Sequence, residues 1–125
     1  MIELTLDRVK ELLNEAVAEK GADYVYTTPD GKQGTPEYQP TCLYVHGDKP
    51  GCIVGHALHR AGVSLSLLLE EEQDDASSVL RSLAQLGVLS YTDGVSQLLY
   101  EAQQRQDHGT SWGEAVQQAL AELEG

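Results

Sequence analysis

The sequence has few cysteines, few basic residues and no long apolar run, and each shortage excludes a class of protein. Two cysteines, Cys42 and Cys52, are too few for the disulfide framework of a small secreted domain. We therefore expect both to stay thiols or to bind metal in a reducing compartment. No window supplies the roughly 20 apolar residues of a membrane-spanning helix, and charges interrupt the N-terminus where a signal peptide needs an apolar stretch. These absences predict a cytoplasmic protein outside the membrane.

Basic residues are scarce, because eight Lys and Arg stand against 20 Asp and Glu and leave a formal net charge of −12. The imbalance is uneven: residues 1–63 hold nine acids and six bases, and residues 64–125 hold eleven acids and two bases. Such a field repels phosphate backbones and anionic membranes, since nucleic-acid binding relies on Lys and Arg to release counterions. We expect no direct nucleic-acid binding and favour a basic protein partner, with solubility alone as the alternative.

Recognised catalytic and nucleotide-binding motifs are absent. The chain contains no G-x-x-x-x-G-K-[ST], no G-x-G-x-x-G, no G-x-S-x-G and no H-E-x-x-H. We therefore expect a protein that is not an enzyme.

Apolar residues at helical spacing are what the chain does contain, and its 125 residues match one domain over 1–125. Candidate caps such as Thr5 begin these segments, and glycines end most of them. In the third segment we expect Leu86 to face the core, and in the last Trp112. The pattern predicts about five helices, within 5–21, 48–62, 76–87, 92–109 and 111–125, with a brief helical turn in 63–72.

Two β-rich runs interrupt the helical pattern. Residues 24–28 and 42–46 are rich in Tyr, Val and Thr, and a polar segment with Gly and Pro separates them. We predict that they pair as one long-looped hairpin. The expected fold is thus mainly α (α+β), with about five helices around one core and a small two-stranded hairpin between the first and second helices.

One cluster combines residues that can bind metal: Cys42, His46, Cys52, His56 and His59. A separation of four places Cys42 and His46 on one face of a strand, and Cys52 and His56 on one face of a helix. A turn could bring the four together as a tetrahedral Cys2His2 zinc site, although the spacing C-x3-H-x5-C-x3-H is not a standard zinc pattern. We expect these to be ordinary core and surface residues with no bound cofactor, and we keep the zinc site as the alternative.

A catalytic interpretation of the same cluster depends on Cys52 and His56. Cys52 lies near the expected start of a helix, whose dipole favours a thiolate, and His56 follows one turn later as a base. No third catalytic group can be named from the sequence. A Cys/His enzyme is therefore kept only as an alternative.

Acidic residues form a ridge along the first predicted helix, each four positions from the next: Asp7, Glu11, Glu15 and Glu19. Like charges at this spacing cost a few tenths of a kcal/mol per pair in an isolated helix. A basic groove on a partner would offset that cost. The ridge is therefore our candidate partner-binding site, and a solvated helix face is the alternative.

Two sequence boxes carry a resemblance to a known group of proteins. The first runs from Cys42 to Gly62 and contains Cys-Ile-Val-Gly-His-Ala-Leu at 52–58, and the second runs from Gln106 to Ala115 and contains Trp-Gly-Glu-Ala. Both resemble a group of small actinobacteriophage and actinobacterial proteins of unknown function, over most of the chain. The resemblance implies a phage accessory protein that binds or inhibits a host protein in the host cytoplasm. It implies no catalytic residue.

Overall fold

Helices dominate the computed structural model, which describes residues 2–25, 44–46, 49–70, 76–92 and 94–124. This confirms the prediction of a mainly helical chain with a few strands. The short third helix corresponds to the brief helical turn expected in 63–72, and it raises the number of helices to six among the described residues. The helices are α1 (Leu6–Lys20), α2 (Ile53–Ala61), α3 (Leu65–Glu70), α4 (Ala76–Gln85), α5 (Val95–Asp107) and α6 (Trp112–Glu124).

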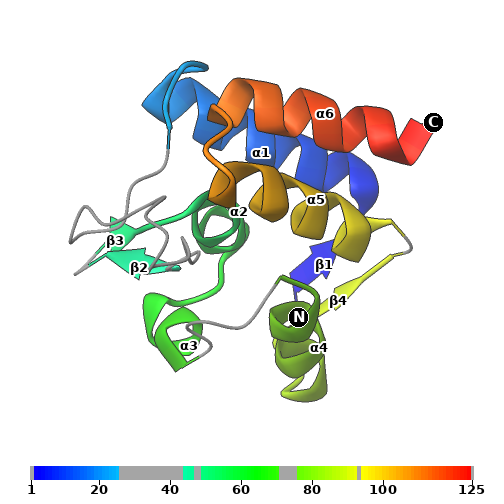
Figure 1. Cartoon of the computed structure of the whole chain (residues 1–125). Helices are drawn as coiled ribbons and strands as arrows, with labels where there is room; N and C mark the ends of the chain where they lie inside the picture. Colours follow the sequence, from blue (N-terminus) through cyan, green and yellow to red (C-terminus); the bar gives the residue numbers. More distant parts are fainter. Residues whose placement is uncertain (1, 26–43, 47–48, 71–75, 93, 125) are drawn as a thin grey trace.

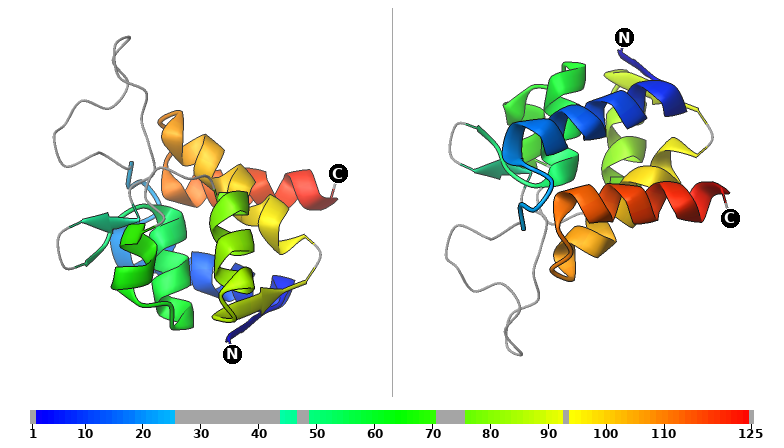
Figure 2. Two further views of the ribbon diagram at one scale, coloured as in Figure 1. Left: turned by 90° about the horizontal axis from the view of Figure 1, so that it is seen from below. Right: turned by 90° about the horizontal axis from the view of Figure 1, so that it is seen from above.

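The helices pack around a core to which every one of them contributes. Helices α1 and α6 lie side by side on one side of the molecule, and α5 lies below them (Figures 1 and 2). Helix α5 contacts α6, α4 and α2, while α1 contacts α2 and α6. The largest fully buried side chains are Trp112, Tyr44, Leu4, Leu12, Leu13, Ile53, Leu58, Leu68, Leu80, Leu83 and Leu89.

A parallel pair of strands, which the sequence pattern did not reveal, joins the start of the chain to its second half. Strand β1 (Ile2–Leu4) pairs with β4 (Leu89–Tyr91), with Ile2 opposite Leu89 and Leu4 opposite Tyr91. Leu4 and Leu89 are buried in the core. Three residues are too few for a period-of-two pattern to stand out, which explains why the pair was missed.

A two-stranded hairpin does lie between α1 and α2, but its strands differ from those predicted. Strand β2 (Val45–His46) pairs antiparallel with β3 (Lys49–Pro50), and the described residues of the predicted run 24–28, which are 24 and 25, are not in a strand. The carbonyl of Tyr24 instead accepts a hydrogen bond from the backbone N–H of Trp112, at 2.8 Å. Residues 26–43, which include half of the residues in the two predicted strands, lie outside the described residues.

The ends of the helices confirm several predictions and correct two. Thr5 caps α1 by accepting a hydrogen bond from Arg8 N, at 3.2 Å, and Gly21 follows its last residue. The predicted start of the second helix at 48–51 was wrong, because Cys52 is the N-cap of α2 and Pro50 belongs to β3.

Leu86 was expected in the core but is exposed, because α4 ends in a glycine turn. Gly87 has a φ of +78°, and the N–H of Val88 donates to the carbonyl of Leu83. In this C-terminal motif the residue after the glycine returns to the helix, so Val88 packs against the core and Leu86 points outward. Trp112, by contrast, is fully buried as predicted.

Candidate functional site

Helix α2 forms one wall of the candidate site, and close backbone packing fixes its position. A Cβ atom on Gly55 would overlap the backbone carbonyl oxygen of Tyr44, so only glycine fits there. Gly113 at the start of α6 has the same role, because its Cβ would lie 2.8 Å from that of Ala22.

Two buried glutamines on α5 cap the starts of two other helices. Gln106 Oε1 accepts a hydrogen bond from the first backbone N–H of α2, that of Ile53, at 2.8 Å. Gln103 Oε1 accepts from the first N–H of α4, that of Ala76, also at 2.8 Å, and its Nε2 donates to Tyr44 Oη at 2.9 Å. The first N–H groups of a helix have no partner within it, so these side chains satisfy buried donors that would otherwise destabilise the fold.

Asp107 completes this network at the end of α5. Gln106 Nε2 donates to Asp107 Oδ1 at 2.8 Å, which orients the amide that caps α2. Burial raises the pKa of the Asp107 carboxyl from 3.8 to about 6, and the hydrogen bond from Gln106 and the charge of His108 oppose this rise in part. The carboxylate therefore carries its charge at neutral pH at a cost to the folded state.

The side of α2 that faces α1 carries charged and ionisable groups. His56 is buried, with its ring 5.3 Å from that of Trp112 in an edge-to-face arrangement. Its Nδ1 lies 3.7 Å from Glu19 Oε2, and Glu19 also forms an ion pair with Arg60. Arg60 Nη1 lies 3.5 Å from a second carboxylate of α1, that of Glu15. These four side chains form a charged seam between α1 and α2.

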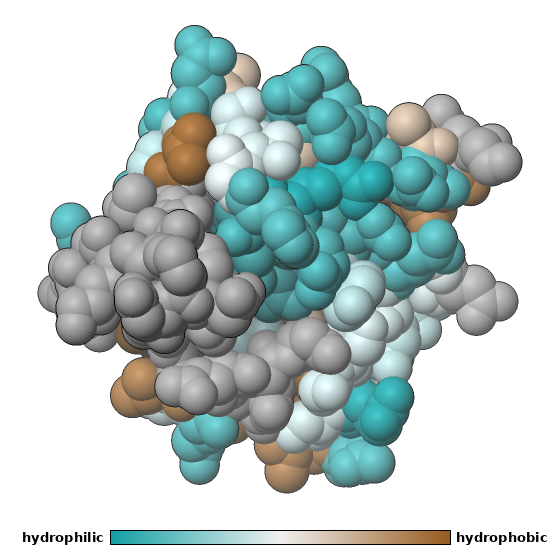
Figure 3. Space-filling model, viewed as in Figure 1, coloured by the Kyte–Doolittle hydropathy of each residue, from teal (hydrophilic) through white to brown (hydrophobic). Residues whose placement is uncertain are grey.

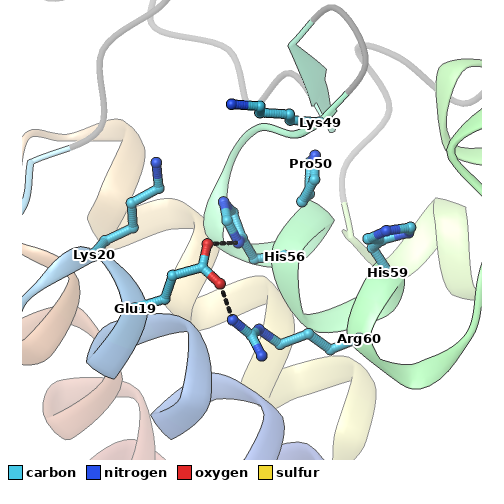
Figure 4. Close-up of a pocket in the computed structure, with 7 residues that line it drawn as sticks. All are labelled: Glu19, Lys20, Lys49, Pro50, His56, His59 and Arg60. Atoms are coloured by element: carbon cyan, nitrogen blue, oxygen red, sulfur yellow. Dashed lines mark hydrogen bonds and ion pairs between the residues drawn. The ribbon is translucent and has the colours of Figure 1, made fainter.

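A pocket opens at this seam and is enclosed by three elements. Its volume is about 460 Å³, and α1, β3 and α2 supply its lining. Figure 4 shows the Glu19 carboxylate between His56 and Arg60, with Lys20 and Lys49 extending from α1 and β3. The lining residues are Glu19, Lys20, Lys49, Pro50, His56, His59 and Arg60.

The acidic ridge proposed from the sequence divides into two parts in the structure. Glu15 and Glu19 face Arg60 in the charged seam, whereas Glu11 pairs with Arg8 on the outer surface, at 3.0 Å. Asp7 is exposed in the first turn of α1. The structure thus leaves Asp7 and Glu11 as the part of the ridge directed away from α2.

The cysteine and histidine cluster is only partly within the described residues. Cys52 is buried and disulfide-bonded, which contradicts the expectation that it stays a thiol or binds metal. The count of two cysteines argued against a framework of several bridges, but it leaves room for one. A disulfide sulfur is neither a thiolate ligand nor a nucleophile, so the zinc and Cys/His enzyme hypotheses both require Cys52 to be reduced.

The other members of the predicted zinc site do not gather around Cys52 in the described part of the chain. Cys42 and the side chain of His46 lie outside the described residues, and His56 faces Glu19 and Trp112. His59 is exposed, with Nδ1 at 3.1 Å from the carbonyl oxygen of Val63. Among the described residues, no group of three or more His, Cys, Asp or Glu side chains is placed to hold a metal ion.

Sequence reasoning missed the capping glutamines and the link from Arg60 to α1. A signal for the glutamines was present, because Gln103 and Gln106 continue the apolar face that includes Leu99 and Ala102. Polar residues on such a face need buried hydrogen-bond partners. The contact between Arg60 and Glu19 joins residues 41 positions apart, so no local sequence pattern could predict it.

Comparisons with protein-family models, curated proteins and solved structures find no match for this chain. The helices in the described ranges are too short or too polar to cross a bilayer.

Proposed function

We propose that this protein is a non-catalytic interaction module that binds the basic surface of a protein partner through an acidic face formed by α1 and α6. The observation that carries the proposal is the charge on these two neighbouring helices. Helix α6 contains three glutamates and no basic residue, and α1 adds Asp7 and Glu11, which lie beside Arg8 and Lys10. The resemblance to phage proteins suggests that the partner is a host protein and that binding takes place in the host cytoplasm.

Pairing within the molecule distinguishes the available acids from the others. Arg60 already engages Glu15 and Glu19, and Arg105 engages Glu101 and Glu122. Exposed Glu114, in the first turn of α6, forms no ion pair with a described residue. Glu114 and Asp7 are therefore the acids that a partner would reach at the smallest cost in broken contacts, whereas Glu11 would first lose its exposed ion pair with Arg8.

The chemistry of this surface favours an electrostatic contact over an apolar one. Hydrophilic residues cover the region of α5 and α6 in the view of Figure 3. An acidic surface attracts basic partners and speeds their association, and salt weakens the attraction. Affinity for the partner should accordingly fall as the salt concentration rises.

Charge-neutralised variants in a capture experiment from host lysate test the proposal. The variant Asp7→Asn with Glu114→Gln removes two acids of the proposed face that form no ion pair with a described residue, and Glu3→Gln with Glu70→Gln removes two exposed acids elsewhere. We expect the first pair to weaken capture and the second to leave it unchanged, after the captured protein has been identified and its binding repeated with purified components. Equal affinity of both variants for the purified partner would show that the α1–α6 face is not the binding surface.

A further inference from the structure

We propose that the pocket between α1, β3 and α2 binds a small molecule that carries two or more negative charges on phosphate or carboxylate groups. The proposal is independent of the acidic face, because it concerns another surface and the opposite kind of ligand. It starts from an uneven distribution of charge. This acidic protein has only eight Lys and Arg, and three of them line this one pocket.

The lining supplies positive charge that the described residues compensate only in part. Arg60 pairs with carboxylates of α1, but Lys20 and Lys49 form no ion pair with a described residue. Lys20 Nζ lies 5.5 Å from the centre of the Tyr24 ring, an arrangement that orients its ammonium group. The two lysines can thus interact with an anionic ligand, and the exposed ring of His59 also lines the pocket.

The size of the pocket and the charge of the whole protein decide which anion fits. A volume of about 460 Å³ is within the range of small-molecule sites. The net charge of −12 repels a long polyanion such as nucleic acid, which would have to pass along the acidic surface. At physiological salt, charges beyond a Debye length of about 8 Å are largely screened, so a compact ligand responds mainly to the nearby cations.

The Glu19 carboxylate lines the pocket between His56 and Arg60, so it competes with any bound anion for Arg60. We therefore expect two substitutions at this pocket to change its affinity for an anion in opposite directions. Removing a cation at Lys49 should therefore weaken binding, whereas removing the charge of Glu19 should strengthen it. A purely structural role for these residues predicts no such opposition.

Inorganic pyrophosphate and citrate serve as probes for calorimetry on the full-length protein, at an ionic strength held constant with NaCl. We expect Lys49→Gln to weaken binding roughly three- to tenfold, the change produced by losing one charged contact. Glu19→Gln should strengthen binding by a similar factor. Arg81→Gln is the matched control, because it removes an exposed cation of α4 that does not line the pocket. Equal affinities for Lys49→Gln and Arg81→Gln would overturn the proposal.

NMR of the unmodified protein locates the ligand without any substitution. Addition of pyrophosphate should shift the ring resonances of His56 and His59 more than those of His108, which does not line the pocket. Uniform shifts of all three would indicate a general ionic effect and overturn the proposal. An oligothymidylate that binds more tightly than pyrophosphate, and loses affinity in Lys49→Gln, would overturn the assignment to a small molecule in favour of nucleic acid.

Discussion

Helix α2 meets the rest of the protein through two regions of opposite chemistry. In its first turn, Ile53 and Gly55 make buried, uncharged contacts with Gln106 and Tyr44. On its α1-facing side, Arg60 meets two carboxylates whose side chains are 49% and 50% exposed. Buried hydrogen bonds and tight packing cost far more to break than exposed ion pairs. The first region therefore contributes most to the stability of the fold, and the second remains available for binding.

The largest expected effect is that of Gly55→Ala. The added methyl group would overlap the carbonyl oxygen of Tyr44, and that backbone has to move, so we expect a loss of about 3 kcal/mol in the free energy of unfolding. Helix propensity alone predicts the opposite sign, a gain of up to about 1 kcal/mol. Urea denaturation distinguishes the two, and a stabilised variant would show that the contact at Gly55 is loose.

Gln106→Met should have the next largest effect. The substitution keeps the volume of the side chain but removes the acceptor for Ile53 N, and an unsatisfied buried donor costs about 1–3 kcal/mol. Hydrogen exchange at the Ile53 amide should accelerate together with the loss of stability. Gln117→Met, on the exposed side of α6, is the control and should change stability little. If the two variants were equally stable, the cap would contribute nothing.

Asp107→Asn should stabilise the protein at neutral pH. The folded-state pKa of Asp107 is about 6, above its ordinary value of 3.8, so the folded protein binds the proton more tightly than the unfolded chain does. The cost of the charged form is present above pH 6 and disappears as the pH falls toward 4. The variant should therefore unfold at a higher temperature than the wild type at pH 7.5 and at a similar one near pH 4. A difference that does not depend on pH would exclude this cause.

Glu15→Gln tests the charged region and should have the smallest effect. Because the ion pair with Arg60 is half exposed, we expect a loss of less than about 1 kcal/mol, which declines further in 0.5 M NaCl. A double-mutant cycle with Arg60→Gln measures the coupling between the two side chains. A coupling above about 2 kcal/mol would remove the contrast between the two regions of α2.

Local patterns were enough to predict most of the helices. Thr5 and Gly21 bound α1 as expected, and the apolar spacing placed Trp112 in the core. The strands were harder, because β1 and β4 have three residues each and pair across more than 80 positions. Leu86 was misplaced because helical spacing was extended one residue beyond the point where the turn at Gly87 begins.

The candidate site was predicted less well than the fold. The ridge on α1 was found, but its contact with Arg60 depends on how α1 packs against α2. The pocket likewise collects Lys20 from α1, Lys49 from β3 and Arg60 from α2, which are well separated in the sequence. The number of charged residues can be counted from a sequence, but the clustering of Lys and Arg side chains in one pocket can be found only from the tertiary structure.

The dependence of α2 and α4 on glutamines from α5 has a consequence for synthesis on the ribosome. A nascent chain that ends before residue 103 contains both helices but neither of the side chains that cap them. Strand β1 likewise has no partner until residues 89–91 emerge. The segment up to the end of α4 therefore lacks these stabilising contacts while the chain is still growing. Emergence of residues 103–106 from the ribosome, and not the emergence of each helix in turn, should trigger folding.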